Sequence, residues 1–442
     1  MDTIIKTKKF ILKQVFDIKT YGIRELFRKF YLLIKLLIRI PIDMIAIVPC
    51  IIIRLISPWI VIRIERLPAG NFGEFILRTA MYYCKKKLKI DVLKKKNIDF
   101  VYIHHNERVF NKQLAKMWKR KLNILSSYLL DPISRVNKFI PGWRNHIIKS
   151  LSVGNRDVDN FFEKCQILNF TKEEEIYGKK MLNKFGLKDE DKFVCLAVRD
   201  GAYEKKKISN RYRDWSYHDY RNTDIDNFIL AAEELTKRGY YVFRMGVTVK
   251  KPFNSKNSKI IDYANSNLRN DFMDIYLGAK CSFCISTGFG FQYLPYLFRK
   301  PVVQLSIPFG DLLTHNEKFL IMTKHHILNK EKRELSLSEI FSYGLAFTYD
   351  TKIFKQKGIE LVDYSSDEIK DMAIEMHENL EFKRKLNHED EELQKTFKNL
   401  FASNIKRIKH QEKVENPCHI WHGGIRSRFN TKFLRENKDW LR

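Results

Sequence analysis

The sequence lacks an uninterrupted apolar run long enough to cross a membrane as a helix. Residues 30–64 are dominated by Ile, Leu, Val and Trp, but Lys35, Arg39, Asp43 and Arg54 interrupt this region. A spanning helix needs roughly 18 to 20 consecutive apolar residues, and no charge-free stretch here reaches that length. No small-residue cleavage site after a short apolar core is visible, so we expect no secretory signal peptide.

The sequence also lacks a paired set of cysteines. Its seven cysteines are odd in number and widely spaced, and several lie in apolar, strand-like runs. A disulfide framework is therefore not expected, and a reducing compartment fits best. Cys281 and Cys284 have the Cys-x-x-Cys spacing of a zinc or redox site, but no second pair or histidine cluster accompanies them. We expect both to be core residues, and we expect no metal site at Cys418, His419 and His422 either.

Acidic residues are scarce relative to basic ones. The chain has 81 Lys and Arg against 52 Asp and Glu, a formal net charge of +29. Such a charge suits anionic partners, namely lipid, a nucleotide diphosphate or nucleic acid. The basic residues are dispersed and no RNA-binding signature is present, so we expect no nucleic-acid partner.

The length and apolar content predict more than one domain. A chain of 442 residues with 44% hydrophobic residues can bury two cores. Short apolar runs alternate with amphipathic stretches, which is typical of α/β folds. We expect a membrane-associated helical region at 1–58, a first Rossmann-like domain at 59–188, a second at 189–385 and carboxyl-terminal helices at 386–442.

The amino-terminal region has the pattern of a helix lying in a membrane interface. Basic residues recur on an apolar background from Lys6 to Lys35, which would turn cations toward lipid phosphates and the apolar side toward the acyl chains. Pro41, Pro49 and Pro58 are expected to break any long helix. Two alternatives remain open: a helical hairpin buried against the other domains, and a single spanning helix over Met44–Ile62.

The first α/β unit reads as strand, tight loop and helix. Its expected elements are a strand at Trp59–Ile64, a turn at Pro68–Gly73, a helix at Glu74–Lys87, a strand at Ile98–His104 and a basic helix at Lys112–Lys121. This pattern predicts the first, acceptor-side domain.

The second α/β domain shows a more regular alternation. Its expected strands are Phe193–Val198, Tyr240–Arg244, Ile260–Tyr263, Cys281–Ile285 and Val302–Leu305. Helices are expected at Asn227–Arg238, Phe272–Ala279 and up to Phe298. Residues 350–380 are read as a strand, a turn at Gly358 and a helix from Ser366. The basic helical remainder is expected to return to the first domain.

One loop of the second domain has the features of a phosphate site. The strand ending at Ile285 delivers Ser286, Thr287, Gly288, Phe289 and Gly290 to the start of a helix. Backbone N–H groups and the positive end of a helix bind phosphate well. The two glycines allow the backbone to approach a ligand closely.

Other polar residues follow neighbouring strands of this domain. In a doubly wound sheet the carboxyl ends of the strands converge on one crevice, and the side chains expected there are Arg199, Asp200, Arg244, Asp262, Tyr263, Ser286 and Thr287. Fixed guanidinium groups can stabilise a departing nucleoside diphosphate without a metal. The alternative for each arginine is a structural ion pair with Asp200 or Asp262.

The aromatic and charged segment Tyr212–Asn222 is interpreted as a loop that closes over a donor. Tyr220 would stack on a nucleobase, while Arg221 and Asn222 would bond the sugar or phosphate. The adjacent pair His218 and Asp219 is a less favoured catalytic candidate.

An ordered series of motifs in this region resembles a known family. The series is Val198-Arg199-Asp200 with Tyr203, Tyr217-His218-Asp219-Tyr220-Arg221-Asn222, Arg244-Met245-Gly246, Asp262-Tyr263 with Arg269, Asp271, Phe272 and Asp274, Phe298-Arg299-Lys300-Pro301, and Phe433-Leu434-Arg435-Glu436-Asn437. It resembles bacterial glycosyltransferases associated with surface polysaccharide clusters, most strongly over residues 190–310. The resemblance implies a GT-B fold, in which two Rossmann-like domains face a cleft, and a nucleotide-sugar donor.

A more distant similarity is to the heptosyltransferases of lipopolysaccharide synthesis. Gly73-Glu74 matches the Gly-Asp pair that opens their first helix, and Thr287-Gly288 matches the Thr-Gly before their donor-site helix. The resemblance makes Glu74 the leading general base. The sequence departs from that family in having Glu for Asp, and Phe291 or Gln292 where a histidine is expected, so the donor sugar stays unassigned.

The chemistry of an inverting transfer agrees with a base on the first domain. A carboxylate or imidazole must take the acceptor proton on the face opposite the diphosphate. Glu65, Glu74, His104 and His105 all lie near strand ends there, and we take Glu74, His105 and Asp200 as the catalytic candidates. The alternative for Glu74 is a carboxylate that stabilises the helix dipole.

The sequence therefore predicts a metal-independent glycosyltransferase with no cofactor beyond its nucleotide-sugar substrate. It would act on a growing glycan, O-antigen or lipid-linked acceptor at the cytoplasmic face of the bacterial inner membrane, as a peripheral or monotopic protein. Two other functions remain open: a non-catalytic scaffold of a polysaccharide assembly complex, and a basic RNA-binding protein.

Overall fold

The computed structural model describes residues 22–90, 95–152, 157, 159–203, 215–305, 309, 316–411 and 425–442. The chain divides into two compact units that alternate along the sequence. The smaller comprises Met1–Leu67, Leu93–Asn106 and Leu122–Ile148, and the larger comprises Pro68–Val92, Glu107–Lys121 and Lys149–Arg442. The boundaries expected after residues 58, 188 and 385 each fall inside one of these units.

The smaller unit is a short parallel sheet with helices packed on it. Its strands pair in parallel with Val61 opposite Asn97, and an isolated bridge joins Val101 to Ile124. Its elements are α2 (Ile23–Ile56), β1 (Val61–Arg66), β2 (Asn97–Tyr102), α5 (Ser127–Asn137) and η1 (Trp143–His146).

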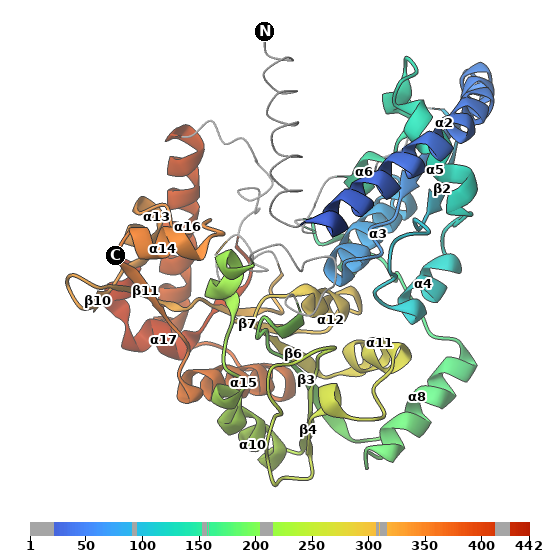
Figure 1. Ribbon diagram of the computed structural model, residues 1–442. Helices are drawn as coiled ribbons and strands as arrows, with labels where there is room; N and C mark the ends of the chain where they lie inside the picture. Colours follow the sequence, from blue (N-terminus) through green and yellow to red (C-terminus); the bar gives the residue numbers. More distant parts are fainter. Residues whose placement is uncertain are drawn as a thin grey trace. The chain divides into compact units, whose positions relative to one another are not determined.

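Helix α2 is held to this unit by one face of its carboxyl-terminal half. Ala46, Cys50 and Ile53 recur at helical spacing and pack with Leu130 and Ile133 of α5 in a common core. The two helices run side by side in Figure 1. An ion pair between Asp43 and Arg135 adds a polar contact to this interface.

The rest of α2 presents apolar side chains outward. Ile45 is 73% exposed and Leu55 is 67% exposed. At 34 residues the helix is about 51 Å long, which exceeds the ~30 Å hydrocarbon core of a bilayer. Among the described residues it is the helix that is long and apolar enough to cross a membrane, judged by length and composition.

The expectation that Pro41 and Pro49 break the helix is wrong, because α2 runs through both. Each proline removes a single N–H donor, and helical bonding continues on either side. Pro58 does lie beyond the end of α2.

The larger unit is built on a seven-stranded sheet in which every neighbouring pair is parallel. The strand order is β12-β8-β7-β6-β3-β4-β5. Counted from β3, the first six strands have the 3-2-1-4-5-6 order of a doubly wound Rossmann sheet, and the order reverses between β3 and β6. The strands are β3 (Lys192–Ala197), β4 (Tyr240–Arg244), β5 (Ile260–Ile261), β6 (Phe283–Ser286), β7 (Val302–Leu305), β8 (Leu320–Met322) and β12 (Arg428–Phe429).

Helices cover both faces of this sheet, so its central strands are buried along their whole length. All four residues of β6 and all four of β7 are buried, which is the pattern of a parallel strand covered on both sides. Figure 1 shows α10 (Ile229–Lys237) and α15 (Ser366–Glu381) on one face, and α11 (Asp271–Lys280) and α12 (Tyr293–Leu297) on the other.

The remaining elements of the larger unit surround this sheet. A small antiparallel sheet has the order β10-β9-β11, with bounds β9 (His325–Leu328), β10 (Arg333–Glu334) and β11 (Ile359–Val362). The other helices are α3 (Phe72–Lys87), α4 (Lys112–Lys119), α6 (Lys149–Ser152), α7 (Phe161–Lys164), α8 (Lys172–Lys184), η3 (Ser216–Arg221), η4 (Ile225–Phe228), η5 (Tyr263–Asn265), η6 (Gly290–Gln292), α13 (Leu337–Ser342), α14 (Thr351–Gln356), α16 (His388–Gln411), α17 (Thr431–Glu436) and η9 (Lys438–Leu441).

Two expectations near the carboxyl end differ from the structure. The segment after Asp350 is the helix α14, not a strand, because the Asp350 side chain accepts from the Lys352 N–H and caps it. Where a return to the first domain is expected, the chain instead contributes β12, which pairs with β8 in the large sheet.

Candidate functional site

The predicted phosphate loop begins where the strand order of the large sheet reverses. Strand β6 ends at Ser286, and the next residue is bonded to the end of β3. The Thr287 N–H donates to the Ala197 carbonyl at 3.1 Å, and the Thr287 hydroxyl accepts from the Arg199 N–H at 2.8 Å. Ligands of doubly wound sheets bind at this reversal, outside the carboxyl ends of the strands.

Among the described residues, the first amides of the loop are the ones with hydrogen-bond acceptors. Gly288 has a φ of 78°, and its N–H donates to the Ser286 hydroxyl at 3.3 Å. That hydroxyl donates in turn to Gln292. Within the described residues, no acceptor is found for the N–H groups of the next three residues, Phe289, Gly290 and Phe291. Three successive amides at the start of η6 and α12 are therefore available to an anion.

The first turn of α3 lies against this loop. A Cβ atom at Gly290 would lie 2.8 Å from the backbone nitrogen of Gly73, and one at Gly73 would lie 2.9 Å from the Gly290 Cα. Such distances are shorter than van der Waals contact, so both positions require glycine. The structure thus places Gly73 against the loop that begins with Thr287-Gly288, at its later glycine Gly290.

Glu74 follows Gly73 in the first turn of α3. Asn71 caps the helix by accepting from the Glu74 N–H at 3.4 Å, and the Glu74 carboxylate forms an ion pair with Arg78 one turn later. The side chain of Glu74 is 39% exposed. Glu74 therefore lies at the positive end of the helix dipole, is partly accessible to solvent and is close to the phosphate loop.

Residues that the sequence reasoning missed support the same contact. Phe72 stacks on Phe110 at 4.8 Å between ring centroids and lies 6.5 Å from Phe291. The Glu107 carboxylate accepts from the Gly70 N–H at 2.7 Å. No local pattern identifies these residues, because Glu107 and Phe110 meet the turn before α3 only after folding.

Arg221 reaches the phosphate loop from η3. Its guanidinium donates to the Gly288 carbonyl, which places a cation beside the available amides. The neighbouring Asn222 bonds instead to Asp219 at 2.9 Å, and its carbonyl accepts from Lys324 at 2.5 Å. Burial lowers the pKa of Lys324, and Asp363 opposes this effect.

Arg244 does not lie beside the phosphate loop and instead forms the structural ion pairs that were the alternative expectation for it. Its side chain is 0% exposed and donates to Asp262 at 3.1 Å, with Asp200 at 3.7 Å. Asp200 also accepts from the backbone N–H of Lys250 at 2.6 Å, so the three charged groups join the ends of β3, β4 and β5. An arginine buried between two carboxylates holds the strand ends together.

The two tyrosines expected at the donor are core residues. Tyr220 packs 5.9 Å from the Phe354 ring, in the main hydrophobic core. Tyr263 is fully buried and donates to Asp274 at 3.0 Å. Burial raises the pKa of Tyr263, and the Asp274 carboxylate raises it further. The rings therefore bury apolar surface and leave no face for a nucleobase.

His105 belongs to the smaller unit, with the other histidine and acid candidates of that region. Its ring lies between those of His104 and Tyr128, with centroid distances of 4.4 and 4.6 Å. Its backbone N–H donates to the Ser127 hydroxyl at 3.1 Å. Burial raises the pKa of Glu65, another base candidate.

The cysteines fit the expectation for core residues where they are described. Cys281 and Cys284 are both fully buried, and Cys284 lies within β6. The group Cys418, His419 and His422 lies outside the described residues, as does the first part of the segment Tyr212–Asn222.

No protein-family model and no curated protein matches the chain. Among solved structures it is similar to a glycosyl transferase of family 9 from Veillonella parvula DSM 2008, with 12% identity and a TM-score of 0.36 over 59% of this chain and 85% of that one. It is also similar to the ADP-heptose lipopolysaccharide heptosyltransferase II of E. coli, with 12% identity and a TM-score of 0.34 over 59% and 90% of the two chains. Similarity at this level does not establish a shared fold or activity.

Proposed function

We propose that the chain is a glycosyltransferase that moves a sugar from a nucleotide-sugar donor to a surface glycan or lipid-linked acceptor. The observation that carries the proposal is the loop at the reversal of strand order, with three available amides and the Arg221 guanidinium beside it. The family resemblance of the motifs between residues 190 and 310 points to the same reaction.

The loop suits the diphosphate that leaves during sugar transfer. Negative charge grows on the leaving group in the transition state, and amides and a guanidinium that are already in place stabilise it without reorganising. The sheet bonds of Thr287 and the Ser286 contact hold the first part of the loop in position. In this proposal Arg221 takes the role that the sequence suggests for Arg244, and no metal is needed.

Glu74 is the proposed general base. The contact of Gly73 with Gly290 keeps its helical turn next to the loop that would hold the donor. A base must reach the acceptor hydroxyl directly or through one water, and Glu74 is the exposed carboxylate on this turn. The ion pair with Arg78 would orient its carboxylate.

The smaller unit is proposed to hold the enzyme at the cytoplasmic face of the inner membrane. The outward side chains of α2 are apolar, whereas its charged residues are mostly basic. This combination suits an anionic bilayer surface and would bring a lipid-linked acceptor to the enzyme.

The proposal is tested with two variants and one control on the purified protein. Arg221→Ala is expected to weaken nucleoside diphosphate binding by about tenfold or more, since one charge-assisted hydrogen bond contributes roughly 1.5–3 kcal/mol. Glu74→Gln should keep that affinity and lose sugar transfer. Arg238→Ala, which removes a surface ion pair with Glu234, should change neither.

Calorimetric titration with nucleoside diphosphates measures the first effect, and restoration of surface glycan in a deletion strain measures the second. Absence of binding to any nucleoside diphosphate would refute the donor site. Full glycan restoration by both Glu74→Gln and Arg221→Ala would instead indicate a scaffold without turnover.

A further inference from the structure

A polar pocket lies near the amino-terminal ends of β8 and β12, whereas the phosphate loop follows the carboxyl end of the central strand β6. It has a volume of about 540 Å³ and is lined by Glu317, Leu386, Glu391, Gln394, Lys395, Lys398, Asn399, Arg426 and Arg428. Glu317 precedes β8, and Arg426 precedes β12. These are amino-terminal strand ends, whereas Thr287 and Gly288 follow the carboxyl end of β6.

One face of α16 forms a wall of this pocket. Glu391, Gln394, Lys395 and Lys398 recur at intervals of three and four residues, so they share a side of the helix. The Gln394 side-chain amide donates to the Phe429 carbonyl at 2.7 Å and accepts from the Phe429 N–H at 3.0 Å. This pair of bonds satisfies the outer edge of β12 and fixes the register of the helix against the strand.

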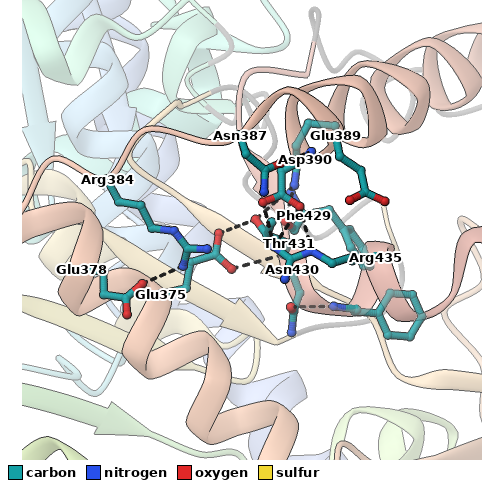
Figure 2. Close-up of polar contacts among 12 residues, drawn as sticks. Glu375, Glu378, Arg384, Asn387, Glu389, Asp390, Phe429, Asn430, Thr431 and Arg435 are labelled. Carbon is teal, nitrogen blue, oxygen red and sulfur yellow. Dashed lines mark hydrogen bonds and ion pairs between the residues drawn. The ribbon is translucent and has the colours of Figure 1, made fainter.

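Buried polar contacts hold the two walls rigidly together. Figure 2 shows Arg435 directed at Asp390 near the start of α16, with bonds of 2.7 to 3.0 Å. Glu375 of α15 accepts from the Thr431 hydroxyl at 2.6 Å and from its N–H at 3.2 Å. Asp390 is 1% exposed. The elements that frame the pocket are therefore held in fixed positions relative to one another.

Among the described residues, the cationic charge of the pocket exceeds its acidic charge. Four cationic side chains line it against two glutamates. Lys395 is 3.3 Å from Glu392, and Arg428 donates to the neutral amide of Asn379. For Lys398 and Arg426, no carboxylate lies within ion-pair distance among the described residues. Burial lowers the pKa of Lys398, and Arg428 lowers it further against a smaller opposing effect of Glu317.

We propose that this pocket binds a small phosphorylated anion, separately from the donor loop. Lys398, Arg426 and Arg428 would bond the phosphate oxygens, and Gln394 and Asn399 line the remainder. The lining has one apolar residue, Leu386, and no aromatic ring, so it suits inorganic pyrophosphate or a sugar phosphate and not a nucleobase. The volume is in the range of small-molecule sites.

Lysine acylation followed by mass spectrometry tests the site on the full protein. Inorganic pyrophosphate and a hexose phosphate are the two probes. Either is expected to slow acylation of Lys398 severalfold, while Lys406, which is exposed on the same helix, reacts at an unchanged rate. The probe with the lower half-protection concentration identifies the source of the phosphate. No protection of Lys398 by either probe at millimolar concentration overturns the proposal.

Variants separate this pocket from the donor loop. Arg426→Ala is expected to raise the half-protection concentration at Lys398 about tenfold, because one charge-assisted contact is lost. Arg221→Ala should leave protection unchanged. If Arg221→Ala abolished protection of Lys398, the effect would be transmitted from the donor loop and the separate site would be refuted. The result with Arg221→Ala does not depend on whether the donor loop binds a nucleotide.

Discussion

The contact between Gly73 and Gly290 gives a quantitative test of the site. In Gly290→Ala the added methyl group would meet the Gly73 nitrogen at 2.8 Å and its Cα at 3.1 Å. Ordinary contacts of carbon atoms are about 3.5–4.0 Å, so the loop and the α3 turn must separate by about half an ångström or more. Both groups are backbone, and neither can rotate away.

Overpacking of this kind costs about 1–3 kcal/mol. We expect Gly290→Ala to lower the free energy of unfolding by that amount, measured by urea denaturation. Displacement of the loop should also slow sugar transfer by about tenfold to a hundredfold, since misplacement of about 1 Å has an effect of that size. Nucleoside diphosphate affinity should fall in parallel, measured by calorimetry.

Gly239→Ala is the matched control. Gly239 has a φ of +87° and no atom within 4 Å of an added Cβ, so alanine there costs about 1–2 kcal/mol through its left-handed backbone alone. Stability should fall in both variants, and ligand binding only in Gly290→Ala. If the two variants kept equal diphosphate affinity, the argument that the α3 turn fixes the loop would be refuted.

Four further predictions concern stability and membrane binding. Replacing Arg435 with Ala should lower the free energy of unfolding by about 3 kcal/mol in urea denaturation, because Asp390 stays buried without its partner. The control Lys438→Ala breaks an exposed ion pair with Glu389 and should cost under about 1 kcal/mol. Equal costs would contradict the stabilising role of the buried pair. Arg244→Met should likewise destabilise by about 3 kcal/mol, since Asp262 and Asp200 lose their buried cation, and a loss of diphosphate binding with unchanged stability would restore it to the donor site. His325→Ala should cost about 2 kcal/mol in the free energy of unfolding near pH 6. Burial lowers the pKa of His325, but Glu334 and Glu368 outweigh burial and raise this pKa to about 10, so the stabilisation by His325 is complete below its unfolded pKa near 6.5 and is lost as the pH rises through 10. A cost that does not depend on pH would be evidence against the two ion pairs. The double variant Ile45→Ser, Ile52→Ser should weaken cosedimentation with anionic vesicles at least about tenfold. The control Ile176→Ser, at an exposed position of α8, should leave cosedimentation unchanged. Equal binding by the unchanged protein, the double variant and the control would exclude α2 as the membrane-binding surface.

The sequence predicts five of the seven strands of the large sheet, β3 to β7, because each contains a short apolar run, and it misses β8 and β12. Tyr240–Arg244 and Val302–Leu305 are found at the expected residues, and the loop after Ser286 follows from the same pattern. A parallel strand between two helical layers has no polar face, so its signal is local and strong.

The roles of single polar residues are not encoded locally in this way. Arg244 ends a strand whether it holds a phosphate or a carboxylate, and its role is decided by Asp262, which reaches it from the neighbouring strand. The roles of Tyr220 and Tyr263 are equally hard to predict, because the neighbouring residues in the sequence do not distinguish a tyrosine stacked on a nucleobase from one in the core.

Strand β12 shows why the sequence predicts only helices at the carboxyl end. It contains two residues, Arg428 and Phe429, and no periodicity can be recognised over that length. Its place in the sheet depends on β8 about a hundred residues earlier and on the Gln394 side chain, which occupies its open edge as a further strand would. The same pairing of β12 with β8 and Gln394 brings Arg426 and Arg428 into one pocket with Lys398 of α16. This cationic pocket therefore forms from residues that are far apart in the sequence and are not distinguished there from the chain's many other basic side chains.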